Sequence, residues 1–387
     1  MLFRSGGPDC DIKRVNDNLI RQNICLLCYD SNGKTINELT EMTGIPKPYL
    51  EFDLGWLVDR EFLILKNKRY ITNFGIKDRH HFHDVKEIYI KFKEDYYRKI
   101  IDYLNSHEED IRNIGFYGCD FDWNKLLWAI LTLYLRYFSK SEPLKTLKIS
   151  DICDLHKDGG RYSINGFNQS DNQLLDLNTV ISEPVFESEK WNKISGIWCG
   201  NISETTSVFK DVNNKPELAT YWLGLYIFAN NISALTKNDH QQKTWKKILA
   251  NLLNNNFSAS DISVEEKELF ATAIKEKIVL KDGDKYIPQF VIFTFDQFEK
   301  LCSEIFEPLV QSIKPQTLKL IEIFRELNER SISGKNQNYN RNYINKWTYF
   351  DIWDSGIKNF MFAADEGYLY MPKIPKDGTS LTLSFVY

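Results

Sequence analysis

The first eighty residues carry basic side chains whose chemistry suits contact with phosphate. Lysine and arginine bind the phosphates of nucleic acids through charge-assisted hydrogen bonds. The candidates for contact with DNA, seven basic residues and one tyrosine, are Arg14, Arg21, Lys34, Lys47, Tyr49, Lys66, Lys68 and Arg69. Residues 13–80 hold 11 Lys or Arg against 9 Asp or Glu, a difference of +2. Any affinity for DNA must therefore come from a local patch.

These candidates lie on a predicted order of helices and strands. Apolar spacing predicts a first helix over Arg14–Tyr29 and a second over Thr35–Thr43, which Gly44 interrupts. A third helix is predicted over Lys47–Arg60, with leucines at i, i+4 and i+7. Two short strands are predicted on either side of the basic turn Lys66–Arg69.

Helix, turn, helix and hairpin is an order that resembles the winged helix-turn-helix domains of bacterial transcription regulators of the MarR-like and GntR-like kind. The resemblance covers residues 13–78 of 387 and rests on the pattern of elements. It implies that Lys47–Arg60 is the recognition helix, which such domains place in the major groove of DNA.

The predicted recognition helix has an unusual composition for a reader of DNA. Its predicted exposed positions include the acids Glu51 and Asp53 and the large apolar residues Phe52 and Trp56. Acids oppose a phosphate backbone, so the wing and the first helix are expected to carry more of the contact. Exposed aromatic residues are typical anchors of protein interfaces, which makes these four residues candidates for contact with a protein partner. Alternatively, Phe52 and Trp56 pack against the following helices.

The predicted fold class is α+β and mainly helical. The organisation that we expect is a tail over 1–12, the winged helix over 13–78, a helical extension over 79–155, a mixed α/β segment over 156–240, a degenerate second winged helix over 241–300, and a helix with a small β segment over 301–387. The second winged helix is inferred from a weak repeat, in which Tyr70-Ile71-x-x-Phe74-x-Ile76 returns as Tyr286-Ile287-x-x-Phe290-x-Ile292 at an offset of 216 residues. Residues 246–300 have 8 Lys against 9 Asp or Glu, which favours scaffolding or dimerisation over DNA contact.

Further elements are predicted from periodicity outside the winged modules. Helices are expected over Asp84–Ser106, Asp122–Phe138 and Glu217–Asn230, and short strands within Gly159–Asn168 and Trp191–Ile202. The apolar run Leu126–Phe138 is shorter than the ~20 residues that span a bilayer, so a buried core helix is expected. Near the end of the chain, the predicted elements are a loop over Gly334–Asn345 and strands over Phe360–Ala364, Tyr368–Met371 and Ser380–Val386.

Metal binding and catalysis are not expected. The seven cysteines are irregularly spaced, and Cys25 and Cys28 lack a second pair at zinc-binding spacing. No nucleotide-binding, zinc-protease or nucleophile-elbow motif is present, so no catalytic residue and no cofactor is assigned. The N-terminus lacks the apolar run of a signal peptide, and a cytoplasmic protein with free thiols is expected.

The sequence therefore predicts a bacterial transcription regulator that binds duplex DNA through its wing and first helix, without membrane attachment. One alternative is an adaptor that uses the winged fold to bind a protein partner. Another is a plasmid-type replication initiator with tandem winged helices, and a homodimer is also left open.

Overall fold

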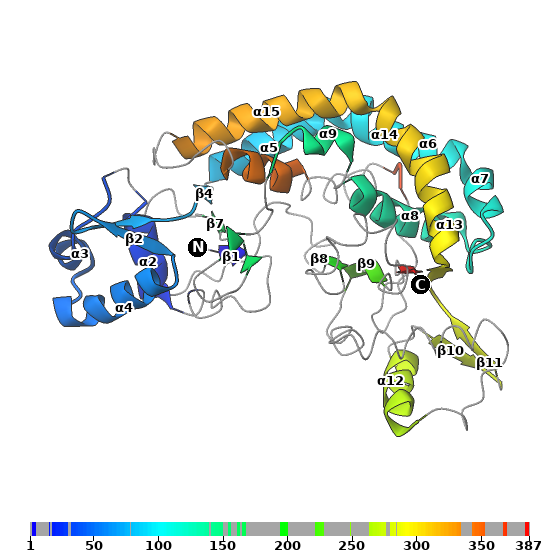
Figure 1. Cartoon of the computed structure of the whole chain (residues 1–387), viewed down its shortest axis with the longest axis horizontal. Coiled ribbons are helices and arrows are strands. Elements are labelled where there is room, and N and C mark those ends of the chain that lie inside the picture. The colour runs from blue at the N-terminus through cyan, green and yellow to red at the C-terminus, as the bar shows by residue number, and fades with distance from the viewer. Residues whose placement is uncertain are drawn as a thin grey trace. The chain divides into compact units, whose positions relative to one another are not determined.

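The computed structural model shows a mainly helical α+β protein with several small sheets (Figure 1). The chain forms two compact units: the first holds Met1–Lys91, Lys145–Glu187 and Lys319–Ile352, and the second holds Phe92–Leu144, Ser188–Leu318 and Trp353–Tyr387. The structure describes residues 2–4, 15, 18–29, 32–77, 79–138, 141–149, 154–155, 161–162, 165–167, 194–199, 221–227, 248, 263–275, 279–283, 285–333, 343–352, 367–369 and 384–386. Among these residues, no helix is long and apolar enough to cross a membrane.

Residues 18–77, called here the first module, form three helices and a β-hairpin (blue in Figure 1). The elements are α2 (Leu19–Leu27), α3 (Ile36–Thr43), α4 (Lys47–Asp59), β2 (Leu63–Lys66) and β3 (Arg69–Thr72). The two strands pair antiparallel, and Lys34 forms an isolated bridge with Tyr70 along the free edge of β3. These bounds match the predicted elements, except that α2 begins at Leu19 instead of Arg14.

Local signals in the sequence explain where these elements begin and end. Thr35 and Glu38 form a capping box at the start of α3, in which each side chain accepts a hydrogen bond from the other residue's N–H. Gly44 ends α3 with φ of 69°, a left-handed conformation that glycine adopts without strain. Asn67 and Lys68 form the hairpin turn with φ of 53° and 64°, as a two-residue turn of type I′ requires.

The first module encloses its own apolar core. Leu50, Leu54 and Leu57 are fully buried, which confirms the predicted inner face of α4. The other fully buried residues of this cluster come from α2, α3, β2 and the segments beside these elements, and they are Val15, Ile24, Cys25, Cys28, Leu39, Phe62, Leu63 and Phe74. The Thr72 hydroxyl donates to the Cys25 carbonyl at 2.5 Å, which joins β3 to α2.

Other elements of the first unit surround this module. A three-stranded sheet has β7 (Asn165–Phe167) in the centre, antiparallel to β1 (Leu2–Arg4) and parallel to β4 (Ile76–Lys77). The remaining elements are β5 (Asp154–Leu155), β6 (Arg161–Tyr162), α5 (Arg79–Phe92), the unit's part of α15 (Lys314–Ser333), and a helix over 343–352. Buried His81 of α5 lies 3.6 Å from Asp351, to which Asn328 of α15 also donates at 2.8 Å.

The second unit combines helices with a four-stranded sheet. Its helical elements are η1 (Lys93–Arg98), α6 (Lys99–Ser106), α7 (Glu108–Asn113), α8 (Trp123–Phe138), α9 (Glu142–Lys145), α12 (Val264–Lys275), α13 (Phe295–Leu301), η4 (Cys302–Phe306) and α14 (Glu307–Ser312). The sheet order is β12 (Val291–Phe293), β13 (Ser384–Val386), β9 (Tyr221–Ile227), β8 (Ile194–Cys199), in which only β12 and β13 are parallel. The predicted core helix is confirmed, because α8 is buried from Leu126 to Leu135.

The second unit repeats the order of α4, β2, β3, β4 and α5 with a helix, a hairpin, a strand and a further helix. The segment from α12 to α13 is called here the second copy. The strand β2 begins at residue 63 and β10 (Val279–Asp282) at residue 279, a spacing of 216. The same spacing relates β3 to β11 (Lys285–Pro288) and the start of α5 to the start of α13. Burial repeats as well, because Phe74 and Phe290 are both buried beneath their hairpins.

Four sequence predictions differ from the structure. Residues 2–4 of the predicted tail form β1, and the predicted helix Glu217–Asn230 contains the strand β9. β9 pairs along both edges, so its backbone is held as a strand by hydrogen bonds to β8 and β13. The helix over 343–352 includes the last residues of the predicted loop Gly334–Asn345. Tyr368 lies in a bend instead of a strand, and the predicted strand Phe360–Ala364 lies outside the described residues.

Candidate nucleic-acid interface

Helix α4 is buried along one side and exposed along the other. The exposed positions begin in its first turn and continue to its end, and they are Lys47, Pro48, Tyr49, Glu51, Phe52, Gly55 and Asp59. No side chain caps the N-terminus of α4, and its first turn contains no acidic residue. The positive end of the helix dipole therefore lies beside Lys47 without an opposing carboxylate in that turn.

Arg21 and Asp53 form a buried ion pair inside the first module. The Arg21 Nε donates to Asp53 Oδ1 at 2.7 Å, and the two side chains are only 10% and 12% exposed. The prediction that Asp53 lies on an exposed face is therefore wrong, and Arg21, a candidate for contact with DNA, has its charge paired inside the module. The pairing also removes one of the two acids that argued against DNA contact by α4.

Trp56 is held in the same cluster. Its ring lies between two guanidinium groups, with Arg21 at 3.9 Å and Arg60 at 4.5 Å from the ring centroid, and it stacks on Phe62. Trp56 is half-buried and packs against the core of the module, so it is not the exposed anchor that the sequence predicted. Phe52 differs, because its side chain is exposed.

Arg69, like Arg21, makes polar contacts inside the first module. Its Nη2 donates to Glu38 Oε1 at 2.9 Å, and its Nε donates to the Asn32 carbonyl at 2.7 Å. These bonds fasten β3 to the segment that leads into α3. Hydrogen bonds from Thr35 and the contact with Arg69 lower the pKa of the Glu38 carboxyl to about 2. Arg69 therefore neutralises a carboxylate of the module, and little of its charge is left for DNA.

Lys34 also lies within the module's structure. It is half-buried, and its backbone exchanges hydrogen bonds of 2.9 Å and 2.8 Å with Tyr70. Arg14, the remaining candidate of the first helix, lies outside the described residues. The basic candidates that remain are the lysines of α4 and of the hairpin.

Three of the predicted basic residues are exposed and make no ion pair with any described residue. Lys47 begins α4, Lys66 ends β2, and Lys68 lies in the hairpin turn. Their charges are available to a partner in solvent. Tyr49 is also exposed, so four of the eight candidates for DNA contact lie where a nucleic acid could reach them.

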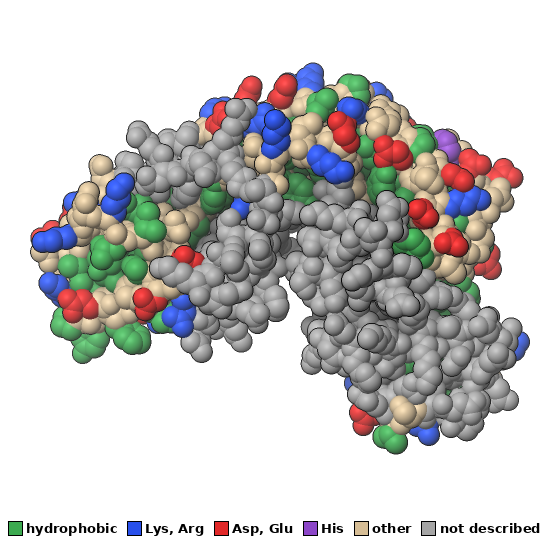
Figure 2. Space-filling model, in the orientation of Figure 1, with side chains coloured by type: hydrophobic (Ala, Val, Ile, Leu, Met, Phe, Trp, Pro, Cys, Tyr) green, Lys and Arg blue, Asp and Glu red, His purple; other side chains and the backbone are tan. Residues whose placement is uncertain are grey.

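Tyr49 and Phe52 give the exposed side of α4 an aromatic surface. Each is 72% exposed, and their spacing of three residues puts them on neighbouring positions of one helix face. The exposed Glu51 lies close enough to Tyr70 of β3 to contribute, after burial, to raising the pKa of that phenol. Figure 2 shows hydrophobic side chains gathered on this module, with charged groups beside them.

The second copy has different chemistry at the corresponding positions. At the spacing of 216 residues, Lys66 corresponds to exposed Asp282, and Phe52 corresponds to exposed Glu268. The sequence also gives Asp284 at the position of Lys68. The same order of elements therefore carries lysines and aromatic rings in the first module and acids in the second copy.

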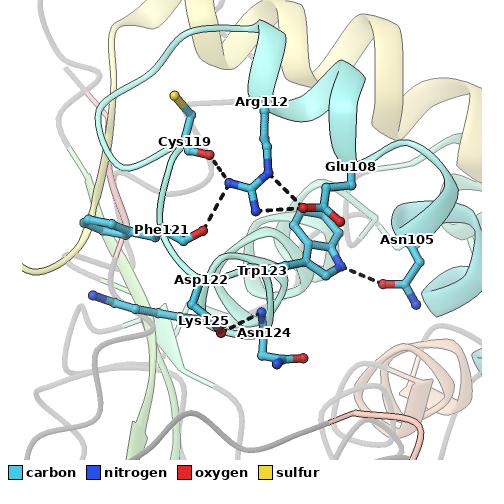
Figure 3. A network of polar contacts seen from close by, with 9 residues as sticks. All are labelled: Asn105, Glu108, Arg112, Cys119, Phe121, Asp122, Trp123, Asn124 and Lys125. Carbon is cyan, nitrogen blue, oxygen red and sulfur yellow. Dashed lines mark hydrogen bonds and ion pairs between the residues drawn. The ribbon is translucent and has the colours of Figure 1, made fainter.

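A second polar cluster lies around Arg112 of α7 (Figure 3). Arg112 forms an ion pair of 2.7 Å with Glu108, and it donates to the carbonyls of Cys119 and Phe121. Its bonds close the loop that leads into α8, where Asp122 accepts from the first-turn N–H groups. These bonds connect one side chain with nearby backbone, which is the arrangement of a structural brace.

Lys125 is the most perturbed amine of this cluster. Burial lowers its pKa to about 8, and its Nζ lies 4.0 Å from the centroid of the Phe121 ring. Among the described residues, no group of three or more His, Cys, Asp and Glu could hold a metal ion. Cys25 and Cys28 are buried free thiols, and burial raises the pKa of Cys28 to about 12, which opposes formation of the reactive thiolate.

No protein-family model, curated protein or solved structure matches the chain. The assignment of the site therefore depends on its geometry. Sequence reasoning missed the roles of Glu38 and Arg60, which hold Arg69 and Trp56. The sequence did signal a structural role for Glu38, because Thr35-x-x-Glu38 is the pattern of a capping box. No local pattern in the sequence indicates that Arg60 contacts Trp56.

Proposed function

We propose that the first module is a winged helix-turn-helix that contacts duplex DNA, and that the chain regulates transcription. In this proposal α3 and α4 are the helix-turn-helix, and β2 and β3 form the wing. Lys47 and Tyr49 at the start of α4 contact DNA together with Lys66 and Lys68 of the hairpin. Arg21 and Arg69 hold the module together, and they take no part in the contact.

The exposed lysines of the hairpin are the observation that carries this proposal. Lys66 and Lys68 occupy exposed positions where the second copy has Asp282 and, in the sequence, Asp284. The hairpin itself therefore forms with either charge, and folding does not require lysine there. A cluster of lysines on a projecting hairpin matches the way in which a wing contacts the phosphates of DNA.

The number of free charges sets the strength that we expect. Three lysines that neutralise about three phosphates give a slope of roughly −3 in a plot of log affinity against log salt concentration. Binding without sequence preference is then weak at physiological salt. A specific site must add contacts from α4.

The test is binding of the full-length protein to labelled duplex DNA, measured by fluorescence anisotropy at several salt concentrations. The double variant Lys66→Glu, Lys68→Glu is expected to abolish binding at about 50 mM salt, because it places two acids against phosphate. The matched control is Lys281→Glu, Lys285→Glu, which makes the same change of charge on the hairpin of the second copy. The control variant is expected to retain binding.

Failure of the wild-type protein to bind duplex DNA at low salt would contradict the proposal. Equal loss in both double variants would contradict the assignment of the contact to the first module, because it would show only a response to net charge.

A plasmid-type replication initiator is the second candidate, and the repeat favours it. Two modules of the same order in one chain fit a protein that binds DNA through tandem winged helices. The acids on the second hairpin oppose that role for the second copy. A weakened complex in the Lys281→Glu, Lys285→Glu variant would support the initiator over the regulator.

A further inference from the structure

Folding of the first module does not explain the two exposed aromatic rings of α4. Tyr49 and Phe52 are each 72% exposed, so their rings contribute little to the core. In the second copy, exposed Glu268 occupies the position of Phe52, and the sequence gives Glu265 at the position of Tyr49. The same helix therefore forms with charged residues at both positions, and the rings of α4 point to binding.

The grooves of duplex DNA are a poor match for this surface. Base edges in the major groove are read mainly by hydrogen bonds from Arg, Lys, Asn and Gln. Among the exposed residues of α4, Lys47 alone is of these types. The flat face of a ring can stack only on the flat face of a base, and stacking between neighbouring base pairs hides those faces in a duplex.

We infer that α4 binds unpaired bases of a DNA strand, with Tyr49 and Phe52 as stacking platforms. This inference rests on the proposed function, because Lys47, Lys66 and Lys68 hold the phosphates in both. Aromatic stacking on a single strand strengthens binding by about 5- to 100-fold for each base. The module therefore engages DNA most tightly where the duplex is open.

The experiment compares three labelled DNAs with the full-length protein at about 50 mM salt. They are a single strand of alternating guanine and thymine, a single strand of thymine, and the duplex of the first sequence. The wild-type protein is expected to bind both single strands more tightly than the duplex.

Variants of the two rings test stacking directly. Tyr49→Ala and Phe52→Ala are each expected to weaken single-strand binding by about 5- to 100-fold, and Phe52→Ala is expected to change duplex binding less than about twofold. Phe52→Leu keeps an apolar side chain without a flat ring, so it is expected to behave like Phe52→Ala. Val264→Ala, at an exposed apolar position in the first turn of α12, is the control and is expected to leave all three affinities unchanged.

Several outcomes separate this inference from the proposed function. Wild-type binding that is as tight for the duplex as for the single strand overturns the inference, and so does a Phe52→Leu variant that binds like the wild-type protein. If duplex binding is lost in the Lys66→Glu, Lys68→Glu variant while Phe52→Ala leaves single-strand binding unchanged, the proposed function stands and the inference fails. If no DNA binds, both fail.

Discussion

Arg21 shows that a residue's type does not decide whether its charge reaches solvent. Its guanidinium is covered by Asp53 on one side and by the Trp56 ring on another. From the sequence, Arg21, Asp53 and Trp56 were all candidates for contact with a binding partner. Arg21 lies 32 positions before Asp53, so the sequence pattern did not reveal their pairing. Burying an ion pair costs solvation, and the pair is stable only when both charges are present.

Replacing one member of this pair should therefore destabilise the first module. Asp53→Ala leaves the Arg21 charge buried without its partner, and we expect the free energy of unfolding to fall by about 3–5 kcal/mol. Glu51→Ala, two positions earlier and exposed, should change it by less than about 0.5 kcal/mol. Urea unfolding followed by tryptophan fluorescence measures both. Equal small effects would show that the pair is not structurally important.

Glu38 gives the module a dependence on pH. Hydrogen bonds from Thr35, followed by the contact with Arg69, lower its pKa from an ordinary value of 4.5 to about 2. A carboxyl with a lowered pKa in the folded state stabilises the fold above its unfolded pKa, and it loses that effect as pH falls towards the folded pKa. Stability from Glu38 is therefore complete above about pH 4.5 and is lost towards pH 2.

Thermal unfolding at several pH values should show this loss. Glu38→Gln is expected to lower the melting temperature near pH 6 and to have a smaller effect near pH 3, because at pH 3 the Glu38 carboxyl of the unfolded protein is already protonated and the unfolded state is thereby stabilised. Glu41→Gln, one turn further along α3 and exposed, is the control. An effect of Glu38→Gln that is the same at both pH values would contradict the assignment.

At the scale of the elements, local signals predicted the first module well and β9 poorly. The capping box, Gly44 and the leucine spacing of α4 act within a few residues, so they are visible in the sequence. β9 is a strand because β8 and β13 pair with its two edges, and both are distant in the chain. An apolar run of that kind is compatible with either a helix or a strand until its neighbours are known.

Gly33 is a position where the hairpin requires glycine. Its φ is 60°, and a Cβ there would lie 2.5 Å from the carbonyl oxygen of Tyr70, which accepts from the Lys34 N–H. Gly33→Ala is expected to lower the free energy of unfolding by about 2 kcal/mol or more, because a clash adds to the cost of the left-handed conformation. Gly44→Ala has a similar φ and no close atom, so it should cost roughly 1 kcal/mol. Chemical denaturation measures both, and equal losses would argue against the clash.

At the scale of the whole molecule, the chain uses one order of elements twice with different surfaces. The first module has exposed lysines and aromatic rings, and the second copy has exposed acids at the corresponding positions. Buried positions such as Phe74 and Phe290 keep their chemistry, because both must fill a core. Exposed positions are free to differ, which allows the two copies to have different partners.

Local stability should differ across the molecule in a way that hydrogen exchange can measure. α8 is buried along most of its length, whereas α4 has an exposed side. Amide protons in α8 are therefore expected to exchange more slowly than those in α4, since opening α8 exposes more apolar surface. Exchange in α8 that is as fast as in α4 would contradict its role as a core helix.

The sequence by itself determined the first module's order of elements, the inner face of α4, the buried helix α8 and the spacing of the repeat. Each depends on periodicity, capping or turn residues that act over a short stretch of chain. Only the tertiary structure decided which candidates remain exposed. Arg21 pairs with Asp53 and lies over the Trp56 ring, and Arg69 pairs with Glu38, in each case across more than 30 positions of sequence. These contacts use those side chains inside the module and leave exposed Lys47, Tyr49, Glu51, Phe52, Lys66 and Lys68 to meet a partner.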